Sequence, residues 1–190
     1  MHRLVIGFLI ACLGLSAGNL TGKVSAGKGN SVVYVEAITG KTFPAPTTVQ
    51  VMDQKSLLFQ PHVMVVQVGS TVEFLNSDKV AHNIFWPAVS GNKKMSHNMG
   101  TWPSGEKRGF KFDTPGVVPL LCNVHPEMSG YIFVVPTPYF ALTDKEGSFT
   151  IKNVPPGEYT LKTASEAAKP TMQPVTVGPG AVSVSLTVTK

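Results

Sequence analysis

The chain has 190 residues, of which 43% are hydrophobic and 14% are charged, and its formal net charge is +5. This composition is typical of a globular protein with one or two domains, and it excludes a disordered chain. Basic residues are grouped only in the pair at 93–94 and in the trio Glu106-Lys107-Arg108, which excludes the dense basic surface of a nucleic-acid-binding protein. The 18 glycines and 15 prolines separate short segments rich in valine, threonine and phenylalanine, which favours an all-β fold.

Residues 1–17 predict a secretory signal peptide. Arg3 precedes an apolar run from Leu4 to Leu15, small residues follow, and cleavage after Ser16 or Ala17 fits the pattern. The run is too short to span a membrane. A buried first strand would not need a basic residue ahead of this run. We therefore expect a product that is exported to the periplasm or secreted.

The signal region also holds Cys12, at the end of the stretch LIAC, which resembles a bacterial lipoprotein cleavage box. Use of that box would make Cys12 a lipidated N-terminus. Because the apolar run continues past Cys12, we favour an exported product without this anchor. In either case Cys12 is no disulfide partner for Cys122, so the exported chain would carry one free thiol in an oxidising compartment.

Strands are predicted beyond the signal peptide, first at residues 18–24 and 31–38 and then from about residue 47. In VEFLNSDKVAHNIFWP, Val72 and Phe74 alternate with polar residues and predict a strand that ends in a polar turn at 76–78. His82 follows this turn. A side chain just past the end of a strand is well placed to meet a distant loop.

Cys122, His125 and Met128 share one short loop, at even steps of three residues. Thiolate and thioether are soft ligands and imidazole suits copper, whereas zinc sites do not use methionine. A cysteine nucleophile would need a base and an oxyanion site, for which the sequence shows no signature. A buried, inert cysteine would explain the thiol but not its two neighbours. The loop is typical of a blue-copper site, which combines two histidines, one cysteine and a weak axial methionine.

Such a site needs a second histidine from elsewhere in the chain. His2 would leave with the signal peptide. His62 starts a strand without a preceding polar turn, and His97 lies in a predicted exposed loop. We therefore expect His82 to be the second ligand.

Residues 47–135 resemble the cupredoxins, the blue-copper family that includes amicyanin, pseudoazurin and plastocyanin. The likeness lies in LLFQPHVMVVQVGSTVEFLNSD, in the pair HN at 82–83 and in GTWPSGEKRGFKFDTPGVVPLLCNVHPEMSGYIFVV. The Cys-x2-His-x2-Met spacing is similar to that of the amicyanin loop. The resemblance implies a Greek-key β-sandwich with one type 1 copper at one end, bound by His82, Cys122, His125 and Met128.

The resemblance also implies roles for residues around these ligands. Asn83 would tie the two ligand loops together, with its backbone N–H directed at the Cys122 sulfur. Close relatives have proline two positions after the cysteine, and Val124 at that position leaves room for a second N–H bond to the sulfur. Pro126 would stiffen the loop.

For electron entry, the family resemblance indicates the exposed edge of His125. The apolar residues expected around it, as a surface for a partner protein, are Val124, Pro126, Phe85, Trp86 and Pro87. For the aromatic pair, ordinary core packing is an equal alternative.

Residues 143–162, TDKEGSFTIKNVPPGEYTLK, predict a hairpin, a turn and another strand. They resemble the carboxypeptidase-regulatory-like (transthyretin-like) β-sandwich, and VTVGPGAVSVSLTVT would supply its last strands. That module normally opens with two strands like those at 18–24 and 31–38. We expect residues 18–46 and 136–190 to form this second small sandwich, with the cupredoxin inserted. Alternatively, the opening strands extend the cupredoxin sheet.

Three functions follow: a one-electron carrier, a copper-binding or delivery protein, and a non-redox adhesive or carbohydrate-binding module. The complete ligand set favours the carrier, because full ligation resists exchange of the metal. A multicopper enzyme would need more histidines than the two that remain. The layout also resembles exported bacterial proteins described as methylamine-utilisation or plastocyanin-like. We predict a non-enzymatic electron carrier that works with redox partner proteins and has no membrane span.

Overall fold

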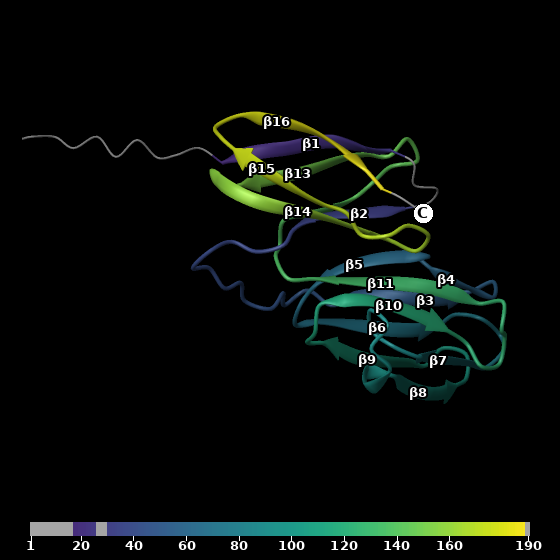
Figure 1. The fold of residues 1–190 in the computed structure, drawn as a ribbon. Coiled ribbons are helices and arrows are strands. Elements are labelled where there is room, and N and C mark those ends of the chain that lie inside the picture. Colours follow the sequence, from purple (N-terminus) through teal and green to yellow (C-terminus); the bar gives the residue numbers. More distant parts are fainter. Residues whose placement is uncertain (1–16, 26–29, 189–190) are drawn as a thin grey trace, which may run out of the picture.

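The computed structural model describes residues 17–25 and 30–188. They form sixteen strands and one short 3-10 helix (Lys93–Met95), so the predicted all-β fold is confirmed. The strands make four sheets, and Figure 1 shows the strands from both ends of the chain above those from its middle. Cys12 and nearly all of the predicted signal peptide lie outside the described residues. Within the described residues, no helix is long and apolar enough to cross a membrane.

Two of the sheets form a sandwich from the middle of the chain, here called the central sandwich. Its larger sheet contains, in spatial order, β5 (Val63–Gln67), β11 (Ser129–Val135), β10 (Gly116–Leu121), β7 (His82–Trp86) and β8 (His97–Trp102). Its smaller sheet contains, in spatial order, β4 (Leu58–Gln60), β3 (Gln50–Lys55), β6 (Ser70–Asn76) and β9 (Lys107–Phe112). Neighbours in space are often distant in sequence, as when β3 pairs parallel with β6 and β11 pairs parallel with β5.

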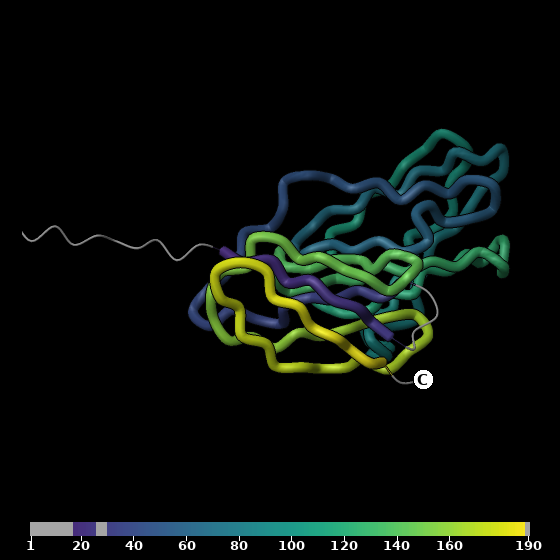
Figure 2. The backbone as a smooth tube through the Cα atoms, turned by 90° about the horizontal axis from the view of Figure 1, so that it is seen from above, coloured from purple at the N-terminus to yellow at the C-terminus, as the bar shows by residue number. Residues whose placement is uncertain are grey.

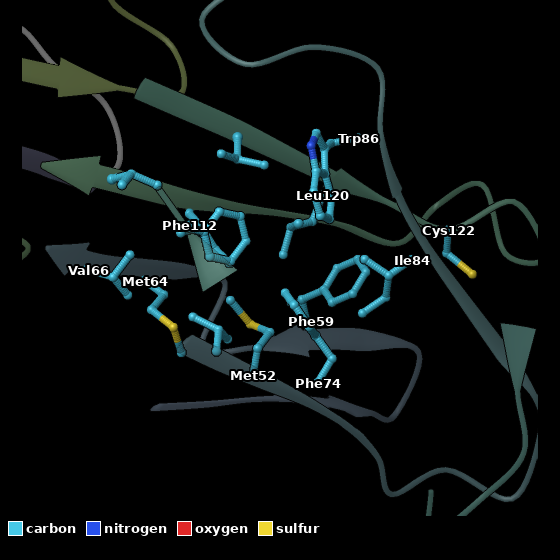
Figure 3. Packing of buried hydrophobic residues seen from close by; sticks show 14 of the residues in the cluster. Met52, Phe59, Met64, Val66, Phe74, Ile84, Trp86, Phe112, Leu120 and Cys122 are labelled. Carbon is cyan, nitrogen blue, oxygen red and sulfur yellow. The ribbon is translucent and has the colours of Figure 1, made fainter. Parts of the chain in front are cut away.

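The core of the central sandwich follows from residue alternation along its strands. In β6 every second side chain is buried, including Val72 and Phe74, because successive side chains of a strand point to opposite faces. Burial of each such side chain contributes about 1.5–3 kcal/mol. Cys122 belongs to this core and lies at one end of it, beyond Ile84 (Figure 3). The predicted ligand loop therefore sits on a packed apolar base.

The other two sheets form the terminal sandwich, which is built from both ends of the chain. One sheet contains, in spatial order, β13 (Ser148–Val154), β1 (Gly18–Ser25) and β16 (Ala181–Thr187). The other contains, in spatial order, β12 (Phe140–Leu142), β2 (Ser31–Val35), β14 (Gly157–Ser165) and β15 (Met172–Val177). Figure 2 shows β1, in purple, running beside β16, in yellow.

The opening strands β1 and β2 thus pair with strands that follow residue 139. β1 lies between β13 and β16, and β2 lies between β12 and β14. Neither pairs with a strand of the central sandwich, so they do not extend its sheets. The division into an inserted domain and a surrounding domain remains a proposal.

The predicted hairpin in residues 143–162 is wrong. β12, β13 and β14 follow one another in the chain, but β13 pairs with β1, whereas β12 and β14 both pair with β2. The chain therefore crosses from one sheet to the other at both connections. Asp144 closes the first turn, where its side chain accepts hydrogen bonds from the backbone N–H groups of Glu146 and Ser148.

The two sandwiches pack against each other through a third, smaller apolar cluster. It joins the sheet that contains β2 and β14 to the strands β5 and β11, which Figure 1 shows as adjacent layers. Its buried members are Val32, Val63, Phe133, Val135 and Ala164. Because these side chains exclude water from the contact, they hold the terminal sandwich against the central one.

Candidate metal centre

Three ligand atoms converge at one end of the central sandwich. Nδ1 of His82 lies 3.0 Å from Nδ1 of His125, which in turn lies 4.0 Å from Sγ of Cys122. One ligand atom from each of these residues lies within 4.8 Å of the other two. His82 is the first residue of β7, and the other two residues belong to the loop between β10 and β11. The structure therefore brings together residues that are about 40 positions apart in the chain.

The ligand loop is short and closed at its base. Leu121 and Ser129 are paired at the ends of β10 and β11, and the backbone N–H of Met128 donates to the carbonyl of His125 at 3.0 Å. Gly130, in β11, allows β4 to approach closely, because a Cβ at this position would lie 2.9 Å from Cβ of Phe59. The loop geometry thus depends on strand pairing beneath it.

Met128 is completely buried and belongs to the same core cluster as Cys122. Its burial at this end of the sandwich is consistent with the predicted axial role. We keep its contact with a metal as a proposal.

Asn83 joins the two ligand segments. Its backbone N–H donates to Sγ of Cys122 at 3.4 Å, and its side-chain Oδ1 accepts from the backbone N–H of Asn123 at 3.3 Å. Its Nδ2 donates to Oδ1 of Asn98 and to the carbonyl of Gly100. These bonds hold β7, β8 and the ligand loop in register at the site.

The second N–H bond for which Val124 leaves room is not formed. Among the described residues, Sγ of Cys122 accepts one backbone hydrogen bond, from Asn83. Val124 is instead 47% exposed.

The sequence interpretation missed Asp78, which contacts the other side of the His82 ring. Its Oδ2 lies 2.9 Å from Nε2 of His82. A carboxylate only accepts, so this contact places the proton of the neutral ring on Nε2 and leaves the lone pair on Nδ1, toward the other ligands. An acidic residue four positions before a predicted ligand histidine was the available signal.

Asp78 is itself held in place by the turn between β3 and β4. The backbone N–H of Ser56 donates to its Oδ1 at 2.6 Å, and the N–H of Leu57 donates to its Oδ2 at 2.9 Å. Partial burial raises the pKa of the carboxyl, but the bonds from Leu57, His82 and Ser56 outweigh it and hold that pKa below its ordinary value. The group is therefore an anion at neutral pH.

The rival histidines lie outside the site. His62 contacts Ser129 and Glu166, and His97 packs on the rings of Trp86 and Phe110. Neither belongs to the cluster of potential metal ligands.

Of the two alternatives for Trp86, surface patch or core packing, the structure shows core packing. This side chain is 2% exposed and belongs to the core, where it packs against Phe110 and Phe112. Its indole N–H donates to the carbonyl of Met95. β7 runs away from the ligand end after His82, so Trp86 reaches the core and not the surface around His125.

The donor set fits copper. A thiolate and two imidazoles match the soft and borderline preference of this metal, and all three residues are at least partly buried. His125 is the most exposed of the three, whereas His82 and Cys122 are buried. A bound metal would therefore be shielded from water and reachable through one histidine.

Comparison with known proteins gives matches to the middle of the chain. Residues 46–135 match copper-binding proteins of the plastocyanin/azurin family. A plastocyanin from Scenedesmus fuscus is 30% identical over 78 residues, which cover 38% of this chain and 80% of that protein.

Solved structures are also similar over this region. A Cu(I) structure of an amicyanin mutant has a TM-score of 0.42 and 21% identity, and the match covers 45% of this chain and 81% of amicyanin. A purple cupredoxin from Nitrosopumilus maritimus has a TM-score of 0.40 and 25% identity, with coverage of 45% and 98%.

Proposed function

Because the chain belongs to the plastocyanin/azurin family of copper-binding proteins, we propose that it is an exported blue copper protein that carries single electrons between redox partners. Its cofactor is copper. In the proposed site His82, Cys122 and His125 are the strong ligands and Met128 is the weak axial one. The observation that carries this proposal is the convergence of Nδ1, Sγ and Nδ1 within 4.8 Å at the end of a packed sandwich.

A carrier needs a site that changes little between its two oxidation states. When bound, copper would supply the one-electron Cu(II)/Cu(I) couple, which a His₂Cys set with a weak methionine suits. The protein residues hold the ligands in place: Asp78 fixes the ring of His82, and Asn83 bonds the sulfur of Cys122. A site held in this way limits rearrangement of the ligands.

The exposed edge of His125 is the proposed entry point for electrons. Val124 and Pro126 flank it and are exposed. Leu57, in the turn that contacts Asp78, and Leu58, at the start of β4, are also exposed. These side chains supply apolar surface at the ligand end, where a redox partner would dock. Pro87 is also exposed but lies at the other end of β7.

Copper delivery is the second candidate, and it differs from electron transfer in one measurable property. A delivery protein releases copper in one oxidation state, whereas a carrier keeps it in both. The buried positions of Cys122, His82 and Met128 favour retention. A purely adhesive role for the terminal sandwich would leave the converged ligands unexplained.

The test is repeated redox cycling of the copper-loaded full chain in the presence of a competing Cu(I) chelator. We expect the colour of the oxidised protein to return in every cycle. A Met128→Leu variant should shift the reduction potential more than it lowers copper affinity, since the axial ligand binds weakly. Loss of copper to a modest chelator within the first cycle would replace the carrier by delivery.

Export is proposed from the sequence at residues 1–17 and from the single thiol. Cys122 is buried and free, and copper ligation would protect it in an oxidising compartment. Cell fractionation of the expressed protein, with N-terminal sequencing of the mature form, tests export and cleavage after Ser16 or Ala17.

A further inference from the structure

His62 connects the two sandwiches at the base of the ligand loop. Its Nδ1 lies 3.1 Å from the backbone carbonyl oxygen of Ser129, in the central sandwich, and its Nε2 lies 2.9 Å from Oε2 of Glu166, which follows β14 in the terminal sandwich. The side chains of His62 and Glu166 are 45% and 25% exposed. The ring thus bridges a residue of the terminal sandwich and the strand that leaves the proposed site.

Ser129 is the first residue of β11, where the ligand loop ends. It directly follows the proposed ligand Met128, and it pairs with Leu121, which directly precedes Cys122. The Leu121–Ser129 pair therefore closes the base of the ligand loop. The backbone of His62 supports the same strand, because its carbonyl accepts from the N–H of Tyr131 at 2.8 Å.

The two partners of the His62 ring are both acceptors. A carbonyl oxygen and an ionised carboxylate cannot donate, so both contacts are hydrogen bonds only when both ring nitrogens carry a proton. The neutral ring has one N–H. A charge-assisted bond to Glu166 is the stronger of the two, so the neutral ring keeps that bond and turns a lone pair toward Ser129. The ring of Tyr131 also faces the His62 ring, with ring centroids 5.8 Å apart.

We propose that Glu166 and His62 are positioning residues through which the terminal sandwich holds the ligand loop of the copper site. This inference rests on the proposed function, since it concerns the same site. The apolar contact of β2 and β14 with β5 and β11 holds the end of β14, and with it the backbone that leads to Glu166, beside His62. The terminal sandwich thereby acts as a support for the metal site.

The experiment uses the copper-loaded, oxidised full chain and records its visible and paramagnetic resonance spectra at about pH 5 and about pH 9. Histidine changes charge between these values, whereas His82 and His125 would be held as ligands by Cu(II) at both. We expect the wild-type spectrum to differ between the two pH values. His62→Leu should give one spectrum at both, equal to that of the wild type at the higher pH.

Glu166→Gln separates charge from geometry. The amide donates to Nε2 of a neutral ring, whose Nδ1–H then still reaches Ser129. We therefore expect this variant to keep the low-pH spectrum of the wild type at both pH values. Glu36→Gln is the matched control, because Glu36 pairs with Lys162 inside the terminal sandwich, and it should behave as the wild type.

The outcomes are distinguishable. If the wild type and both bridge variants, His62→Leu and Glu166→Gln, superimpose at both pH values while showing an intense thiolate-to-copper band, the positioning role is wrong and the proposed function stands. If the wild type lacks that band, the proposed function itself fails. Equal changes in Glu36→Gln and Glu166→Gln would also overturn the inference, since the effect would then be general to charge on that sandwich. A double variant of His62 and Glu166 that equals His62→Leu alone supports it.

Discussion

Asp78 and His82 form a carboxylate–histidine pair at the proposed copper site, with 2.9 Å between Oδ2 and Nε2. The carboxylate is anchored by two backbone N–H groups from the turn between β3 and β4. The turn in the smaller sheet therefore fixes Asp78, and Asp78 in turn fixes the ring of His82 in the larger sheet. Such contacts orient a ligand and raise its basicity.

Replacement of Asp78 should weaken copper binding without unfolding the protein. We expect Asp78→Asn to lower copper affinity by about 10- to 100-fold, because the imidazole loses its anionic partner. A chelator competition titration measures this. Asp113→Asn is the control, since Asp113 forms only an exposed pair with Lys111, and an equal loss in that variant would contradict a specific role for Asp78.

The colour of the copper-loaded protein should depend on Cys122. We expect Cys122→Ser to remove the thiolate-to-copper absorption, since the serine hydroxyl provides no such transition, while the fold persists. Absorption and circular dichroism spectra of the two proteins check this. A wild type that binds Cu(II) without a strong visible band would rule out the blue-copper assignment.

The choice of upstream ligand is tested by two histidine variants. His82→Ala should open a coordination position and reduce copper retention, since Nδ1 of His82 lies 3.0 Å from that of His125. His97→Ala should leave the copper spectrum unchanged, because His97 packs on Trp86 away from the ligand cluster. Spectral loss in His97→Ala comparable to that in His82→Ala would reassign the ligand.

Trp86 should matter for stability and not for partner docking. We expect Trp86→Ala to lower the free energy of unfolding by about 3–5 kcal/mol, through the cavity left in the core. Pro87→Ala, at an exposed position, should change it by less than about 0.5 kcal/mol. Denaturant titrations of the copper-free proteins provide both values, and an unaltered stability in Trp86→Ala would place this side chain outside the core.

The independence of the two sandwiches is tested at Gly22. A Cβ there would lie 2.1 Å from the carbonyl oxygen of Val184 and 2.8 Å from the ring of Phe149, so Gly22→Val should disrupt the sheet of β13, β1 and β16. We expect hydrogen exchange to rise in the terminal sandwich while the oxidised protein keeps an intense visible band. Gly178→Ala, where a Cβ meets nothing within 4 Å, is the control. Complete loss of colour in Gly22→Val would mean that the two sandwiches fold as one unit.

The sequence by itself determined the chemistry of the candidate site. Cys122, His125 and Met128 are close in the chain, so their spacing alone predicts that their donors meet. The polar turn before His82 predicts it as the second histidine, and the structure places its ring beside His125. The all-β class followed in the same way from local alternation, as in β6.

Only the tertiary structure decided which strands pair and which side chains support the site. Residue alternation predicts strands on both sides of the turn at 155–157, but the hairpin expected ahead of that turn is not formed, since β13 pairs with β1. A strand's pattern does not specify its partner. β1 pairs with β16 at a separation of about 160 residues, and His62 reaches Glu166 across 104. Asp78 and Trp86 depend likewise on how the sheets pack. Donor chemistry is a property of neighbouring residues, whereas pairing and burial depend on how the whole chain removes apolar surface from water.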